Sequence, residues 1–173
     1  MTVTLTLTPF DYHSPLFYEA VAIYCAVWER DEEDSTLFFR RYARMTDFIG
    51  YVAQVEKQVI GMGFGTLSES GQWWHDKVAE QVGSKHPALQ DAWVLTELAV
   101  LRGYRNTGIG GILHDRVIYE QPHKNVLLST QSDNVAAQRF YKRRGWTMLH
   151  NGFPFRKGCQ PYCIMHKDMH DAR

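Results

Sequence analysis

The chain has 173 residues, of which 45% are hydrophobic and 13% are aromatic. A chain of this size and composition can bury a sizeable core, which excludes an intrinsically disordered protein. The 19 basic and 19 acidic side chains give a formal net charge of zero, so no nucleic-acid partner is expected.

Three further features bear on where the protein works. Its three cysteines are too few, and odd in number, for the disulfide framework of a small secreted protein. The first residues alternate threonine with apolar side chains, unlike a signal peptide, and no apolar run is long enough to cross a bilayer. We therefore expect a cytoplasmic protein with no membrane partner and a single domain over residues 1–173.

The first half of the chain predicts a strand, two helices and a hairpin. Ser14 and Pro15 form a typical helix start, and the acidic run Asp31–Asp34 is expected to connect the two helices. A tight turn at residues 56–58 joins the two hairpin strands. The expected elements are a strand over 3–7, helices over about 14–28 and 37–42, strands Phe48–Val55 and Val59–Leu67, and a polar insertion over 68–91 with one short helix.

The second half predicts strand–helix–strand units, which join parallel strands. Its first strand is the most apolar of the chain, and Gly145 is a typical helix end. The expected elements are strand Trp93–Val100, loop Arg102–Thr107, helix Gly108–Tyr119, strand Val126–Thr130, helix Asn134–Arg144, and strands Trp146–Leu149 and Tyr162–Lys167. The predicted fold class is therefore α/β, with a mixed, mostly antiparallel central sheet and flanking helices.

The segment Arg105–Gly111 carries the strongest functional signal, because it lies between a buried strand and a helix. Its glycines permit positive φ and close approach of a ligand to the backbone. Unpaired N–H groups at a helix start favour an anion such as pyrophosphate, and Arg102 and Arg105 can add charged hydrogen bonds. A Walker A loop would need Lys and Ser/Thr after Gly110, and a dinucleotide fingerprint would need glycine at Leu113. An NTP- or dinucleotide-binding enzyme is therefore disfavoured, and a helix that merely begins with glycines is the other alternative.

Two motifs together resemble those of the GNAT superfamily of N-acetyltransferases. The first, Arg105-x-x-Gly108-x-Gly110 after Leu98–Val100, resembles the acetyl-CoA motif, and Asn134–Trp146 resembles the second motif at the separation that the family uses. The resemblance implies a GNAT-like fold with splayed central strands. It also implies an N-acetyltransferase with acetyl-CoA as co-substrate and a small-molecule amine or a peptide as acceptor. Homodimers are common in this family.

The resemblance also assigns the residues that bind the co-substrate. The pantetheine arm would bond to the main chain near Leu98 and Val100, and Asn134 would contact the same arm. Two positions depart from the family pattern, since Arg102 replaces a common proline and Asn106 a common glycine. Asparagine tolerates left-handed backbone better than most residues, so the loop can still close. The pyrophosphate would bind the backbone amides of Arg105, Asn106, Thr107, Gly108, Ile109 and Gly110.

Amide formation from an amine and a thioester needs a base for the amine and an acid for the departing thiolate. By the resemblance, Tyr141 is the acid, because a phenol, with an ordinary pKa of about 10, can protonate a thiolate whose thiol has a pKa of about 8.5. The alternative is an aromatic that only packs beside Phe140. Glu97 is the expected base. It is a carboxylate inside an otherwise apolar strand, and such a charge costs free energy unless it faces a cleft or a partner. A structural salt bridge at Glu97, or a water chain as base, is the alternative. Ser129 stands on the next strand where other members carry a glutamate.

The acceptor site is expected along the first two helices, the hairpin and the insertion. Trp28, Glu29 and Trp73 are the substrate-binding candidates, because aromatic and acidic groups suit a cationic amine such as a polyamine or an aminoglycoside. The alternative is that the acidic run is a solvated connector and that the tryptophans belong to a core or an interface.

Other functions fit less of the sequence. The spacing of Cys159, Cys163, His166 and His170 suggests a zinc site, but these residues lie mostly on one predicted strand and their pairs are too close for a zinc finger. No metal is therefore expected. A non-catalytic acyl-CoA-binding module and a peptide N-terminal or lysine acetyltransferase are the alternatives to an enzyme that acts on a small amine. The candidate acid and base favour an enzyme.

Overall fold

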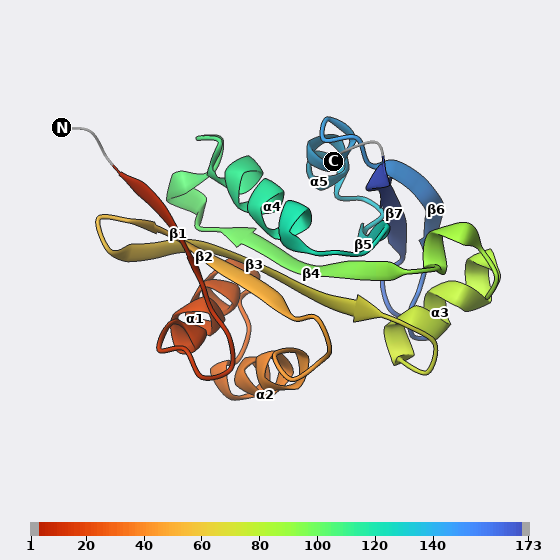
Figure 1. The fold of residues 1–173 in the computed structure, drawn as a ribbon, viewed down its shortest axis with the longest axis horizontal. Coiled ribbons are helices and arrows are strands. Elements are labelled where there is room, and N and C mark those ends of the chain that lie inside the picture. Colours follow the sequence, from red (N-terminus) through yellow and green to blue (C-terminus); the bar gives the residue numbers. More distant parts are fainter. Residues whose placement is uncertain (1–3, 171–173) are drawn as a thin grey trace. The chain divides into compact units, whose positions relative to one another are not determined.

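The computed structural model describes residues 4–170 of the chain (Figure 1). The strands are β1 (Leu5–Pro9), β2 (Ile49–Val55), β3 (Gln58–Ser68), β4 (Ala92–Val100), β5 (Asn125–Gln131), β6 (Thr147–Phe153) and β7 (Tyr162–Asp168). The helices are α1 (Leu16–Trp28), α2 (Glu32–Tyr42), α3 (Trp73–Val82), α4 (Ile109–Glu120) and α5 (Val135–Lys142), with 3-10 turns η1 (Pro87–Leu89) and η2 (Arg102–Tyr104). The strand order is β1-β2-β3-β4-β5-β7-β6. The predicted α/β class with a mixed, mostly antiparallel sheet is confirmed.

Two compact units divide the described chain. The first holds the residues up to Leu67 together with Leu95–Pro122, and the second holds Ser68–Val94 together with the chain from His123 onward. β4 therefore contributes its first residues to the second unit and its last residues to the first. The single domain over residues 1–173 stays a prediction.

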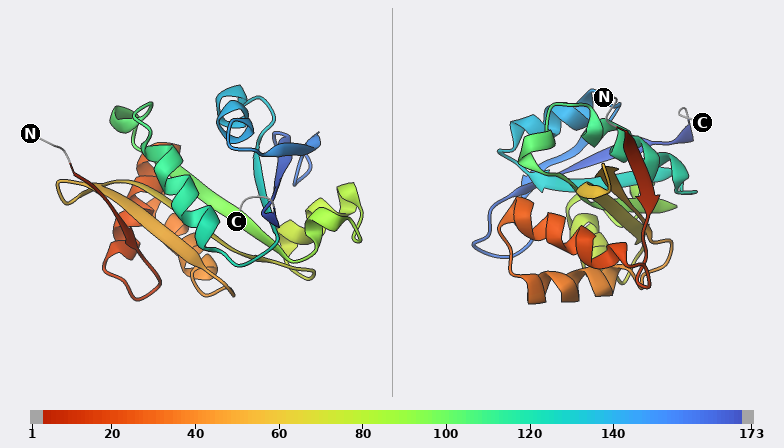
Figure 2. Two further views of the ribbon diagram at one scale, coloured as in Figure 1. Left: turned by 45° about the horizontal axis from the view of Figure 1, so that its top comes forward. Right: turned by 90° about the vertical axis from the view of Figure 1, so that its left-hand side faces the viewer.

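In the first unit, β2 pairs antiparallel with both β1 and β3. Glu56 and Lys57, with φ of 50° and 71°, form the tight turn of the predicted hairpin. Helices α1 and α2 lie on one side of these strands and α4 on the other, as the views in Figures 1 and 2 agree. The apolar core of this unit includes Phe17, Ala20, Phe39, Val52, Met62 and Phe64.

The acidic run Asp31–Asp34 is not the connector that the sequence predicts, because α2 begins at Glu32. The Asp31 carboxylate accepts a hydrogen bond from the Asp34 N–H at 2.9 Å and caps the helix. Acidic side chains in the first turn also suit the positive end of the helix dipole. The run therefore has a structural role at the start of α2.

In the second unit, β4 and β5 run parallel over Ala92–Val94 and Asn125–Leu127, as the strand–helix–strand order predicts. β7 is antiparallel to β5 and to β6, so it lies between them. β6 extends past the predicted strand to Phe153 and begins after the buried Trp146. The apolar cluster of this unit includes Val78, Leu89, Leu127, Phe153 and Ile164.

Helix α5 is shorter than the predicted helix Asn134–Arg144. Asn134 is its N-cap, and the side-chain oxygen of Asn134 accepts a hydrogen bond from the Ala137 N–H at 3.1 Å. Gly145, with a φ of 83°, follows the helix as predicted. A Cβ at this glycine would lie 2.8 Å from the Lys167 ammonium nitrogen, so a side chain there would displace the lysine end, and the positive φ is the main reason for glycine.

Candidate active site

The predicted site residues fall in both units. The first unit holds the predicted phosphate loop Arg105–Gly110, the β4 residues from Glu97 to Val100, and Trp28 and Glu29 on the α1 side. The second unit holds Trp73, Asn134 and Tyr141. The geometry of each group is described within its own unit.

The loop between β4 and α4 is built from left-handed backbone. Asn106 and Gly108 have φ of 60° and 87°, so asparagine does take the conformation in which glycine would be common. A Cβ at Gly108 would meet nothing within 4 Å, so this glycine is needed for its backbone conformation rather than for space. The N–H groups of the first turn of α4 have no partner within the helix, and they present a donor set that fits an anion.

Side-chain hydrogen bonds hold this loop against the end of β4. The Arg105 Nε–H donates to the Val100 carbonyl oxygen at 3.1 Å, and the Thr107 hydroxyl donates to the Tyr104 carbonyl oxygen at 2.6 Å. Arg105 is exposed, and its guanidinium has further N–H donors besides Nε. The arginine can therefore orient the loop and also contact a phosphate.

Glu97 is a half-buried carboxyl group on β4, with a pKa raised to about 8. Burial is the main cause of the raised pKa, while the positive charge of Arg30 and a hydrogen bond from the Trp28 side chain lower it. The pKa of Tyr42 is raised too, mainly by burial and in part by the charge of Glu97. Glu97 therefore has partners in Trp28 and Arg30, and its carboxyl group changes charge at about pH 8.

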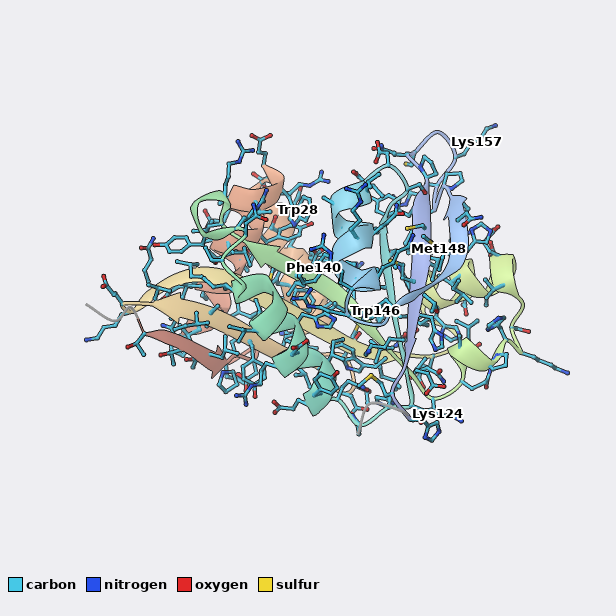
Figure 3. The ribbon with its side chains drawn as sticks, turned by 90° about the horizontal axis from the view of Figure 1, so that it is seen from above. Trp28, Lys124, Phe140, Trp146, Met148 and Lys157 are labelled. Carbon is cyan, nitrogen blue, oxygen red and sulfur yellow. The ribbon has the colours of Figure 1, made fainter. Side chains whose placement is uncertain are left out.

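Trp28 and Glu29 lie where α1 ends. Trp28, labelled in Figure 3, has a side chain that hydrogen-bonds to Glu97, although the residue is 45% exposed. Glu29 takes a left-handed conformation, with φ of 52°, and its N–H donates to the Cys25 carbonyl as the helix C-cap. The sequence singled out Trp28 as a wall of the acceptor site, whereas its bond to Glu97, a residue distant in the chain, left no signal in the sequence.

Tyr141 lies half-buried on α5 among aromatic rings. Its ring meets Phe140 and Trp146 edge to face, with centroids 5.1 and 5.6 Å away, and Figure 3 shows the latter two side chains on and after α5. This packing fixes the ring of the predicted acid. The role of Tyr141 as the acid stays a prediction.

Trp73 and Trp74 begin α3, the helix of the insertion. The Trp74 indole N–H donates to the Ser129 hydroxyl on β5 at 3.2 Å. Both indoles line a pocket with Phe155 and Arg156 of the β6–β7 loop. Sequence reasoning missed these loop residues because nothing local in the chain links them to the tryptophans.

Three further findings concern metal ligands, cysteines and membrane-spanning helices. Across residues 4–170, no group of three or more His, Cys, Asp or Glu side chains could hold a metal ion. Cys163 is buried in β7, while Cys159 is exposed. None of the helices in this part of the chain combines the length and apolarity needed to span a membrane.

Comparisons with known proteins agree with this geometry. Residues 15–146 match the acetyltransferase (GNAT) family. Over 117 residues the chain is 31% identical to the GCN5-like protein acetyltransferase Rv2170 of Mycobacterium tuberculosis, a match that covers 62% of this chain and 57% of that protein. The chain thus spans little more than half of this relative's length.

Solved structures share the fold. A GNAT family acetyltransferase from Elizabethkingia anophelis with acetyl-CoA bound has a TM-score of 0.62 at 14% identity, covering 95% of this chain and 97% of its own. An acetyltransferase of the GNAT family from Staphylococcus aureus Mu50 has a TM-score of 0.65 at 17% identity, with coverage of 95% and 99%. With the family match over most of the chain, the protein belongs to the GNAT family of acetyltransferases.

Proposed function

We propose that this protein is an N-acetyltransferase that moves an acetyl group from acetyl-CoA to a primary amine by direct attack in a ternary complex. Residues 1–173 would act as one catalytic domain. Its three cysteines are free, which suits the reducing conditions of the cytoplasm. The observation that carries the proposal is Glu97, a carboxyl group with a pKa of about 8 on the strand that leads into the phosphate loop.

The loop residues would hold acetyl-CoA. Backbone N–H groups from Arg105 to Gly110 would bind the pyrophosphate, and the arginine side chain would add a charged hydrogen bond. Main-chain groups at Leu98 and Val100 would bind the pantetheine arm, although the Val100 carbonyl already accepts a bond from Arg105. The Asn134 side-chain oxygen caps α5, so its amide N–H groups are the donors left for that arm. When bound, acetyl-CoA supplies the thioester carbonyl.

Proton transfer would be divided between two residues of this chain. The amine nitrogen attacks the thioester carbonyl, its new C–N bond replaces the C–S bond, and the nitrogen loses a proton. Glu97 would take this proton, because a carboxylate with a pKa of about 8 is a far stronger base than an ordinary carboxylate. The Tyr141 phenol would give a proton to the departing thiolate.

Turnover of Glu97→Gln tests this proposal. Thiol release from acetyl-CoA should be measured between pH 6 and 9.5 across amines and peptides. In the parent, the rate should rise through about pH 8 as Glu97 ionises. Glu97→Gln should lose roughly 100-fold in kcat and should lose that rise. Glu80→Gln on α3, an exposed carboxylate that pairs with Lys77, is the control and should keep the parent profile.

Two results would contradict this assignment. An unchanged pH profile in Glu97→Gln would leave a water chain as the base. No thiol release with any acceptor, from protein that binds acetyl-CoA, would favour the non-catalytic module instead.

A protein acceptor is a second candidate function. The supporting observation is the 31% identity to a relative described as a protein acetyltransferase. Peptides with a free N-terminus or an internal lysine therefore belong in the acceptor panel. Acetylation of lysine peptides, with small amines unreactive, would establish this second function.

A cationic small amine, such as a polyamine or an aminoglycoside, has weaker support. Trp28 and Glu29 would provide an aromatic and an acidic group for it. However, Asp31 is engaged as the cap of α2, and Trp28 is engaged with Glu97. Spermidine and kanamycin should be included in the panel to test this acceptor class.

A further inference from the structure

A pocket of about 310 Å³ lies in the second unit, at the start of α3 and beside the β6–β7 loop. Its size is at the small end of the range for ligand sites. Trp73 and Trp74 line it from α3, Ser129 from β5, Phe155 and Arg156 from the loop, and Tyr162 from β7. These residues come from four separate segments of the chain.

Four aromatic rings form half of the residues that line the pocket. The Phe155 ring lies near those of Trp73, Trp74 and Tyr162, at centroid distances of 5.7, 6.3 and 5.7 Å. The Trp74 and Phe155 rings are nearly parallel, with 25° between their planes. Trp73 nevertheless remains 51% exposed. A planar ring placed against this indole would bury its face and gain stacking energy.

The pocket carries a positive charge and no negative one. The Arg156 guanidinium carbon lies 5.3 Å from the centroid of the Trp73 ring. Among the described residues, no Asp or Glu lines the pocket. Asp133 is outside the lining and accepts a hydrogen bond from the Gln160 amide at 2.7 Å. A ligand ammonium group would therefore meet a like charge, whereas a carboxylate would pair with the guanidinium.

Ser129 connects the pocket with the candidate residues of the second unit. Its hydroxyl accepts the Trp74 indole bond, and a hydroxyl also has a hydrogen to donate. Its strand β5 leads into Asn134 and α5, the helix that carries Tyr141. A ligand in this pocket would therefore lie beside the strand that leads to the predicted acid.

We propose that this pocket anchors the acceptor, and that the acceptor is a small amine carrying a planar aromatic ring and a carboxylate, such as an aromatic amino acid. The ring would stack on Trp73 and Phe155, and the carboxylate would pair with Arg156. This assignment rests on the proposed N-acetyltransferase function, since it names the substrate class of that reaction.

Binding of matched probes tests the pocket without turnover. 3-Phenylpropionate, 3-phenylpropylamine and 3-cyclohexylpropionate differ in one feature each and can be compared by isothermal titration in the absence of acetyl-CoA. The aromatic acid should bind at least tenfold more tightly than the aromatic amine. It should also bind better than the saturated acid. Equal or tighter binding of the amine would overturn the proposal.

Substitutions of the pocket residues test whether the probes bind in this pocket. Arg156→Glu should reverse the preference between the aromatic acid and the aromatic amine, and Trp73→Ala should weaken the aromatic acid by about tenfold. Lys157→Gln is the matched control, because this cation neighbours Arg156 but does not line the pocket, and its side chain points outward from the loop (Figure 3). Binding in Lys157→Gln should stay within twofold of the parent. Loss of the aromatic acid in Lys157→Gln but not in Arg156→Glu would overturn the assignment.

Acetyl transfer separates this inference from the proposed function. Phenylalanine should have a higher kcat/KM than phenethylamine, and Arg156→Gln should remove this difference. Thiol release with another amine, together with indifference to phenylalanine, would overturn the acceptor class while the transferase stands. If no amine gives thiol release but the probes bind as expected, the proposed function is overturned. The ligand class of the pocket is then still supported.

Discussion

The two units organise their candidate functional groups in different ways. In the first unit, the phosphate loop depends on backbone conformation, with Asn106 and Gly108 left-handed at the start of α4. In the second unit, the aromatic pocket depends on side chains from α3, β5, β7 and the β6–β7 loop. A site made from consecutive backbone groups depends on single glycines. A site made from distant side chains distributes its stability and selectivity over many contacts.

The largest effect is expected where one glycine sets the backbone. Gly108→Asp adds a side chain at a φ of 87° and a negative charge at the predicted phosphate site. We expect acetyl-CoA affinity to fall more than 100-fold, because the charge opposes the phosphates and the loop must distort. Titration calorimetry with acetyl-CoA measures this change.

Gly158→Asp is the matched control for that variant. Gly158 also has positive φ, 80°, and a Cβ there would also meet nothing within 4 Å, but it lies on the β6–β7 loop. Acetyl-CoA affinity should be unchanged in this variant. Equal losses in the two variants would mean that the backbone cost, and not the position of the loop, accounts for the effect.

Tyr141→Phe tests a side chain that packing holds in place. The phenyl ring can keep its contacts with Phe140 and Trp146, so the variant removes little but the hydroxyl. We expect kcat to fall by about 100-fold and the KM for acetyl-CoA to stay within about twofold. Tyr119→Phe on the exposed face of α4 should match the parent. Parent-like turnover in Tyr141→Phe would restrict this residue to packing.

The same contrast explains what the sequence could and could not predict. The loop, its strand and its helix are contiguous, so a local pattern was enough to place them, and Asn106 takes the expected conformation. The prediction of a connector at Asp31–Asp34 is wrong, because a run of acidic residues is usually solvated. Here the Asp31 carboxylate instead accepts a hydrogen bond from the Asp34 N–H and caps α2. The partner of Glu97 could not be predicted, because Trp28 on α1 and Glu97 on β4 are far apart in the chain and meet only in the folded structure. The pocket around Phe155 was missed for the same reason.

Glu97→Gln should also change how stability depends on pH. The carboxyl group keeps its proton in the folded state up to about pH 8 but loses it above about pH 4.3 in the unfolded chain. Between these values the unfolded state binds fewer protons, so the parent loses stability as pH rises. The loss should be below the limit of about 1.4 kcal/mol per pH unit, since the half-buried group keeps some solvent.

A glutamine at position 97 cannot ionise, so it causes no loss of stability as pH rises. Relative to the parent, Glu97→Gln should therefore gain stability from pH 5 to pH 8 and show no further gain above pH 9. Urea unfolding at four pH values measures this trend. A constant difference across the range would mean that the carboxyl group has an ordinary pKa in the folded protein.

The smallest expected effect concerns the bond between Trp74 and Ser129. Trp74→Phe removes the indole donor and some volume, so its total cost mixes hydrogen bonding with packing. A double-mutant cycle with Ser129→Ala isolates the bond, and we expect a coupling energy of about 1 kcal/mol.

The matched cycle uses Trp73→Phe, because the Trp73 indole lines the same pocket but makes no described bond to Ser129. Its coupling energy should be near zero. Equal coupling in the two cycles would mean that Ser129 responds to ring packing in general. Coupling confined to Trp74 would mean that a single directional bond joins the inserted helix to β5, and that this bond positions the aromatic wall.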